Sequence, residues 1–301
     1  MKKLVLSFFA FGLLAMPFFA QTANQLHSSE KTNISKDVQD SINPKILSAY
    51  KTFVDSAVIY AGQDSLVQAE RYIHQAMKLE PANPHNALLF SNLGTLQRRQ
   101  RQYEKALDSY TYALNMVPRS VPILLNRAAL YLEMGKNELA RVDYSLVLDL
   151  EKKNREALLM RAYIYTGQHD FKSARSDYQS LLTLAPNSYE GRLGLATMEQ
   201  KAGNSSVSLS ILNKMLTDFP HDAVLFTARA GVEQDLQHSD LALLDLEEAL
   251  KIDPKQTEAY LIRGQIYLSQ KNKGQAKRDF EKAISLGTPL ADLRELLERC
   301  K

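Results

Sequence analysis

Residues 121–154 read VPILLNRAALYLEMGKNELARVDYSLVLDLEKKN, and residues 155–188 read REALLMRAYIYTGQHDFKSARSDYQSLLTLAPNS. Aligned without gaps, the two stretches place small and large apolar residues at the same positions, so that Ala174 follows Ala140 by 34 residues. The same interval separates a series of small residues: Ala106, Ala140, Ala174, Ser208, Ala242 and Ala276. A constant period of this length predicts a solenoid of stacked repeats.

Each small residue is followed, four positions later, by a large one. These large residues are Tyr110, Tyr144, Tyr178, Leu212, Leu246 and Phe280. Four units close on a proline, which cannot continue a helix: Pro118, Pro186, Pro220 and Pro254. Small residues beside large ones at helical spacing predict pairs of antiparallel helices that interdigitate closely.

The pattern resembles the tetratricopeptide repeat, a family whose repeats have this period. The resemblance implies an all-α fold, a right-handed α-solenoid of helix-turn-helix units. Seven repeats would cover residues 50–290 and start near residues 50, 87, 121, 155, 189, 223 and 257. Residues 289–301 are predicted to form a capping helix, because Leu290, Leu293 and Leu297 make one apolar stripe.

Repeat five departs from the pattern, since Arg192 stands where the other six repeats have a large apolar residue. It keeps Leu212 and Pro220, which indicates a degenerate repeat and not a missing one. Its glycines Gly191 and Gly194 lower helix propensity. Residues 189–217 are therefore predicted to open early.

The chain begins with Lys2 and Lys3, followed by an apolar run over residues 4–20 and a polar stretch. This layout predicts a signal peptide over residues 1–20, and hence export to the periplasm or beyond the cell. The alternative is a single membrane anchor, for which 17 residues containing Gly12 and Pro17 are short. No integral membrane segment is expected after cleavage, and residues 21–42 are predicted to be a flexible leader.

Charge and cysteine content narrow the classes of partner. Removal of Lys2 and Lys3 lowers the formal net charge from +3 to +1, which leaves no overall field to attract nucleic acid. We therefore expect protein partners and no nucleic acid. The only cysteine, Cys300, could link two chains in an oxidising compartment; the alternative is an unpaired thiol on a frayed end.

Two polar positions change together along the chain. Four repeats have arginine at the seventh position and aspartate at the twenty-third: Arg127 with Asp143, Arg161 with Asp177, Arg229 with Asp245, and Arg263 with Asp279. The other three repeats have neither residue. We predict a structural ion pair between the two helices of one repeat, rather than arginines that bind an anionic ligand.

The family resemblance also implies that partners bind on a concave face lined by the first helices. The residues predicted to take part in partner binding are Val54, Leu88, Arg98, Arg99, Leu125, Leu132, Leu159, Tyr163, Leu193 and Leu261. Most of them are apolar, which predicts an apolar floor. The alternative for Arg98 and Arg99 is that they serve the C-terminal dipole of their helix.

Motifs for catalysis are not found: the chain has no glycine-rich phosphate loop, no Cys and His ligand cluster and no nucleophile elbow. We predict that it is not an enzyme and has no cofactor or metal site. The favoured function is a non-catalytic protein-protein interaction scaffold or adaptor in the cell envelope. The alternative is a receptor or regulatory subunit that binds a small anionic or cell-wall-derived ligand for a separate enzyme.

Overall fold

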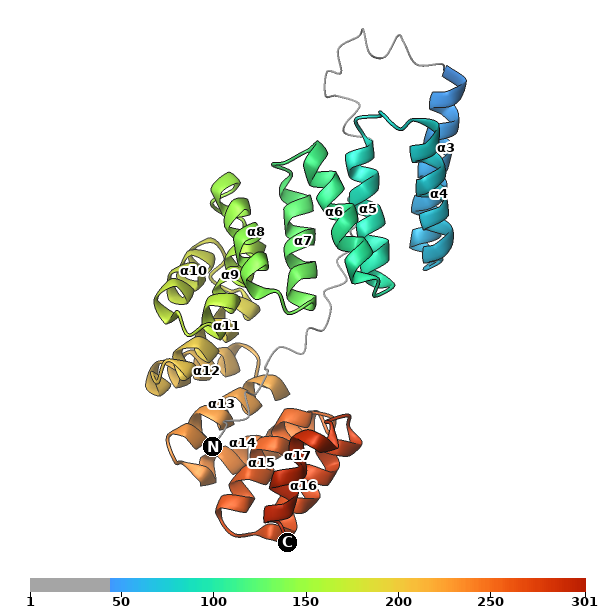
Figure 1. Ribbon diagram of the computed structural model, residues 1–301. Coiled ribbons are helices and arrows are strands. Elements are labelled where there is room, and N and C mark those ends of the chain that lie inside the picture. Colours follow the sequence, from blue (N-terminus) through green and yellow to red (C-terminus); the bar gives the residue numbers. More distant parts are fainter. Residues whose placement is uncertain (1–43) are drawn as a thin grey trace. The chain divides into compact units, whose positions relative to one another are not determined.

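The computed structural model describes residues 44–301, and its regular secondary structure over that range consists of fifteen helices (Figure 1). The helices are α3 (Pro44–Gly62), α4 (Leu66–Leu79), α5 (Asn86–Arg99), α6 (Tyr103–Met116), α7 (Val121–Glu133), α8 (Asn137–Leu150), α9 (Arg155–Gly167), α10 (Phe171–Leu184), α11 (Tyr189–Lys201), α12 (Ser205–Asp218), α13 (Ala223–Asp235), α14 (Ser239–Ile252), α15 (Thr257–Ser269), α16 (Lys273–Ser285) and α17 (Leu290–Arg299). The predicted signal peptide and leader lie outside the described residues.

The chain divides between residues 157 and 158 into two compact helical units. The N-terminal unit contains the pairs α3/α4, α5/α6 and α7/α8 together with the first residues of α9. The C-terminal unit contains the rest of α9 and the helices α10 to α17. Helices α7, α9, α11, α13 and α15 begin at the residues where the repeats were expected to begin. The prediction of an all-α repeat solenoid is confirmed.

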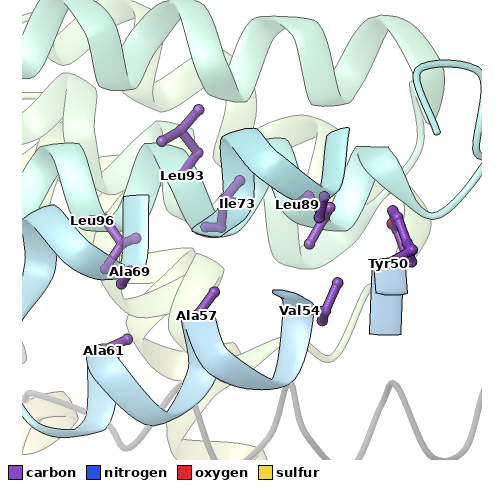
Figure 2. Packing of buried hydrophobic residues seen from close by; sticks show 10 residues of the cluster. Tyr50, Val54, Ala57, Ala61, Ala69, Ile73, Leu89, Leu93 and Leu96 are labelled. Carbon is purple, nitrogen blue, oxygen red and sulfur yellow. The ribbon is translucent and has the colours of Figure 1, made fainter. Parts of the chain in front are cut away.

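The core of the N-terminal unit begins between α3, α4 and α5 (Figure 2). Figure 2 shows Val54 and Ala57 of α3 directed toward the side chains of α4 and α5, among them Ile73 and Leu89. Burial of such apolar side chains is the main favourable term in folding. The Tyr50 hydroxyl closes one end of this core by donating a hydrogen bond to Asn86 Oδ1 at 3.1 Å.

Small and large residues pack against each other in both units as the period predicts. Ala106, Ala140 and Ala174 are completely buried, as are Ser208, Ala242 and Ala276. Two repeats need a residue smaller than alanine on the facing first helix. A Cβ atom at Gly94 would lie 2.8 Å from Tyr110 Cε1, and one at Gly264 would lie 2.7 Å from Phe280 Cε1. Glycine at these positions lets the two helix backbones approach each other.

The turn between the two helices of a repeat uses one residue with positive φ. Two repeats have glycine there, Gly135 at +70° and Gly203 at +83°. The other five place a residue with a side chain in this left-handed conformation: Asp64, Arg101, His169, Gln237 and Lys271. Residues other than glycine are strained in that region because their Cβ crowds the backbone.

We therefore expect the substitution Gln237→Gly to stabilise the chain. Gln237 has a φ of +64°, and glycine would remove the strain at the expense of some backbone entropy. The net gain should be about 0.5–1 kcal/mol in the free energy of unfolding, measured by urea denaturation. The same exchange at Gln179, an exposed residue inside α10, serves as the control and should cost about 1 kcal/mol. Equal destabilisation by both substitutions would contradict the strain argument.

The C-terminal helix α17 packs its Leu293 into a core with Phe280 and Ala283 of α16. Cys300 belongs to the same cluster and is buried, and this burial raises the pKa of its thiol. A buried thiol of raised pKa is a poor nucleophile. Cys300 therefore belongs to a packed core and not to the frayed end considered from the sequence.

None of the helices between residues 44 and 301 is long and apolar enough to cross a membrane.

Candidate functional site

Each of the four arginine-aspartate pairs forms a two-pronged ion pair between the helices of one repeat. Arg127 donates from Nε to Asp143 Oδ2 and from Nη2 to Asp143 Oδ1, both at 2.8 Å. The other pairs repeat this geometry at 2.6–2.8 Å: Arg161 with Asp177, Arg229 with Asp245, and Arg263 with Asp279. The carboxylate raises the pKa of the guanidinium in three of them: Arg127, Arg229 and Arg263.

Aromatic rings complete the environment of these arginines. The guanidinium of Arg127 lies 5.7 Å from the ring centroid of Tyr131, and that of Arg263 lies 5.6 Å from the ring of Tyr260. The side chain of Asp143 is only 3% exposed and that of Arg127 is 19% exposed. A pair with fixed geometry, little solvent and a stacked ring has a structural role, because both charges are already compensated.

The three repeats without such a pair use other contacts, which the sequence analysis did not identify. In repeat one, Tyr72 stacks on Tyr60 with ring centroids 5.3 Å apart. In repeat two, Ser109 Oγ donates to Gln97 Oε1 at 2.8 Å. Repeat five is joined to repeat four by Arg175 and Glu199, whose two hydrogen bonds measure 2.6 and 2.7 Å.

Arg192, the exceptional residue of repeat five, lies within this repeat and not on its surface. Its Nη1 atom donates to Asp218 Oδ2 at 2.6 Å, at the end of α12. Only 10% of the Arg192 side chain is exposed, and its Nη2 atom is buried without a hydrogen-bond partner among the described residues. The ion pair with Asp218 partly offsets the desolvation cost of placing this charge at a position that is apolar in other repeats.

First helices of successive repeats lie closer together than second helices do. Within the N-terminal unit α5 contacts α7, and within the C-terminal unit α11 contacts α13 and α13 contacts α15. Within each unit, contacts between second helices of successive repeats are sparser. In a curved stack the closely spaced layer is the inner one. We call the sides formed by the first helices the inner faces of the two units.

Three residues predicted to line the concave face are buried by this close spacing. Val54 is 5% exposed, Leu193 is 4% exposed and Leu261 is 7% exposed, so these side chains present almost no surface to a partner. The expectation of an apolar floor is therefore wrong at these three positions. Leu88, Leu125 and Leu132 are half-buried in the N-terminal unit. Leu159 and Tyr163 are half-buried in the C-terminal unit.

The two arginines predicted to bind a partner already have acidic neighbours. Arg98 Nε lies 3.4 Å from Glu133 Oε1 on α7. Arg99 Nη2 donates to Asp64 Oδ1 at 2.6 Å, in the turn before α4. Both contacts join neighbouring repeats of the N-terminal unit. Their charge is therefore largely compensated inside the chain.

The inner face of the N-terminal unit combines apolar and acidic groups. Leu125, Ala129 and Leu132 follow one side of α7 at helical spacing, and all three are half-buried. Glu133 ends this stripe, and Glu156, in the first turn of α9, adds a second carboxylate. Glu156 is exposed, yet desolvation by the protein around it raises its pKa, and the positive charge of Arg98 acts in the opposite direction.

The inner face of the C-terminal unit has its own desolvated carboxylate. Glu258 stands in the first turn of α15, at the same repeat position as Glu156. Its Oε1 atom is buried and has no hydrogen-bond partner among the described residues. Desolvation by burial raises the pKa of Glu258 to about 7. Once ionised, this carboxylate carries a charge that its surroundings do not compensate.

We expect the substitution Glu258→Gln to change how stability depends on pH. The folded chain retains a proton on Glu258 up to about pH 7, whereas the unfolded chain loses it near 4.5. Wild-type stability should therefore fall as the pH rises through this window, and the variant should lack this component. At pH 8 the variant should be more stable than wild type by roughly 1–2 kcal/mol, because glutamine does not ionise. The gain is limited to this range because the side chain of Glu258 is only partly buried.

Urea denaturation at pH 5 and pH 8 measures this effect, with Glu295→Gln on the exposed side of α17 as the control. Parallel pH profiles for wild type and Glu258→Gln would show that the carboxylate is not desolvated.

Two shallow hollows in the described part of the chain include neither Arg98 nor Tyr163. Both are open to solvent, one along α4 and one at residues 237–241, at the start of α14. The first is lined by Val67, Glu70, Arg71, His74, Gln75 and Lys78. Within residues 44–301, no three His, Cys, Asp or Glu side chains gather in a way that could hold a metal ion.

The comparisons with known proteins agree with this architecture. Profiles described as tetratricopeptide repeat match residues 91–154, 156–188 and 257–286. The crystal structure of a tetratricopeptide repeat protein from Parabacteroides merdae is similar to this chain, with 34% sequence identity and a TM-score of 0.77. The match covers 84% of this chain and 99% of that one. No curated protein matches the chain.

Two further structures are similar in fold alone. The first is PilF of Pseudomonas aeruginosa, with 14% identity and a TM-score of 0.57 over 71% of this chain and 96% of that one. The second is the APC/C hetero-tetramer Cut9–Hcn1, with 13% identity and a TM-score of 0.59 over 93% of this chain and 59% of that one.

Helix pairs that stack through small residues define the class of the protein, an all-α repeat solenoid. The chain belongs to the tetratricopeptide repeat family. Proteins of this family generally mediate protein-protein interactions, and their fold is generally a non-catalytic scaffold.

Proposed function

We propose that the protein is a non-catalytic adaptor of the cell envelope that binds segments of partner proteins on its inner face. The observation that carries this proposal is the half-buried apolar stripe of Leu125, Ala129 and Leu132 on α7. These side chains keep apolar surface available on a side that the resemblance associates with partner binding. The binding roles of Leu88, Leu159 and Tyr163 remain predictions of the same kind.

The alternative function, a receptor for a small anionic ligand, is less well supported. Such a ligand needs cations that are available for contact. Arg98 and Arg99 each have an acidic neighbour on another helix, and the arginines of the four repeat pairs are bound to aspartates. Neither the hollow along α4 nor the one at residues 237–241 includes Arg98. An anion would have to displace these carboxylates.

Export is the second part of the proposal, and it rests on the sequence of residues 1–20. The basic start and the apolar run are typical of a signal peptide, with cleavage after Ala20. N-terminal sequencing of the protein purified from its native cells should begin at or near Gln21. A chain that keeps residues 1–20 and sediments with membranes would favour an anchor.

The adaptor hypothesis is tested by placing a photo-crosslinking amino acid at Leu132 on the inner face. A matched probe at Val142 lies on the outer side of α8, where 46% of that side chain is exposed. We expect discrete protein adducts from position 132, and their loss when Leu125 is also changed to Glu. The control substitution Leu139→Glu, at a position that is 47% exposed, should leave them unchanged.

The folding of each variant is checked by circular dichroism. Adducts that form equally from both probes, or that survive Leu125→Glu, would count against binding on the inner face. Leu193 is unsuitable for such a test because a charge at this buried position would destabilise the fold itself.

A further inference from the structure

Acidic groups outnumber available cations around the α7 stripe. Arg98, one of the two arginines predicted to bind a partner, is held 3.4 Å from Glu133, the residue that ends the stripe. The other predicted cation, Arg99, is bonded to Asp64. Lys51 is exposed on α3, in the first repeat. Around the stripe itself, one arginine therefore faces two carboxylates.

Because Arg98 is held by Glu133, the second carboxylate, Glu156, has no ion-pair partner among the described residues. No hydrogen bond or ion pair joins it to another described residue, and Arg98 is the only charged group that acts on it appreciably. Glu156 is exposed, so a partner can reach it; the protein around it raises its pKa, while the positive charge of Arg98 lowers it. An accessible carboxylate without a bonded partner can accept hydrogen bonds from a cation that brings its own donors.

On the basis of the proposed function, we infer that the inner face of the N-terminal unit accepts a segment in which a lysine or arginine stands close to an apolar residue. The apolar side chain would contact Leu125 and Leu132 on α7, and the basic side chain would reach Glu156 in the first turn of α9. Apolar contact supplies affinity, while the excess of carboxylates over arginines favours a partner segment with positive charge. An acidic segment would have to displace Glu133 from Arg98 while facing Glu156.

The experiment is a selection of random peptides displayed on phage against the immobilised full chain. We expect the enriched peptides to share a lysine or arginine near an apolar residue. The dissociation constant of a synthetic peptide from the enriched set should rise about tenfold for Glu156→Gln, which corresponds to about 1.4 kcal/mol. Glu104→Gln, which changes an exposed carboxylate in the first turn of α6, is the matched control and should leave the affinity unchanged.

The outcomes separate this inference from the function on which it rests. Enriched peptides without basic residues that lose binding on Leu125→Glu would overturn the inference and keep the adaptor function. Basic peptides that bind equally well to wild type and Glu156→Gln would also overturn it, because their attraction would be non-specific. Failure to enrich any peptide sensitive to Leu125→Glu would count against the proposed function itself.

Discussion

Replacement of Asp143 by alanine should lower the free energy of unfolding by about 3–5 kcal/mol. The substitution removes the carboxylate that accepts both hydrogen bonds from Arg127, at 2.8 Å each. The guanidinium would then remain between α7 and α8 with little access to water. The cost arises mainly from this uncompensated charge, because a well-formed pair balances its own desolvation. Urea denaturation of the full chain measures the change.

A double-mutant cycle isolates the interaction between the two residues. Arg127→Ala removes the charge that Asp143→Ala would leave behind, so the double variant should be more stable than the sum of the single effects predicts. The exposed pair of Lys251 and Glu248, 3.2 Å apart in one helix, is the control and should show a coupling of about 0–1 kcal/mol. A coupling at Arg127 and Asp143 no larger than in this control would contradict a structural role for the four pairs.

The substitution Gly194→Ala should destabilise the chain by about 1–3 kcal/mol. A Cβ atom at this position would lie 2.6 Å from Tyr178 Cε1 and 2.7 Å from Tyr178 Oη. Tyr178 is 1% exposed and has no room to move away, because it packs in the core between α10 and α11. Thermal or urea unfolding provides the measurement.

The control for this prediction is Gly274→Ala in the first turn of α16, where a new Cβ would meet nothing within 4 Å. Because alanine has the higher helix propensity, this change should stabilise the chain by up to about 1 kcal/mol. If Gly194→Ala behaved in the same way as Gly274→Ala, the contact with Tyr178 would have no energetic weight.

Gly194 also changes how repeat five is understood. From composition alone, its glycines predict a segment that opens early. In the structure, Gly194 permits the close approach of Tyr178, while Arg175 and Glu199 bind repeat four to repeat five. Arg175 lowers the pKa of Glu199, so this bond should persist down to acidic pH and weaken as the pH falls through the lowered pKa. The structure therefore assigns these residues to packing between repeats.

Much of the fold could be predicted because each repeat packs its two helices through small and large residues at the same positions. The alternation of Ala140 with Tyr144 appears again as Ala174 with Tyr178. A period of this kind can still be recognised when one repeat departs from the pattern. The arginine-aspartate pairing could be inferred because the two positions change together within one chain. Both regularities depend on contacts inside a repeat or between immediate neighbours, which the period repeats.

The candidate site was less predictable because exposure depends on the spacing between repeats. Val54, Leu193 and Leu261 occupy the same repeat position as Leu125, yet the first three are buried and Leu125 is half-buried. Arg98 and Glu133 are far apart in sequence and belong to different repeats, so no motif joins them. Their contact could be recognised only once α5 and α7 were placed side by side.

The amino-acid sequence by itself determined the repeat period, the small and large partners of the core and the ion pairs within repeats, because these follow from the helical period and from residues in one unit. The tertiary structure alone decided which first-helix side chains remain accessible and which charges are compensated. These properties arise from the distance between neighbouring helices, and desolvation and Coulomb energies change steeply over that distance. Glu156 shows the difference: its repeat position follows from the sequence, and its uncompensated charge follows from its surroundings.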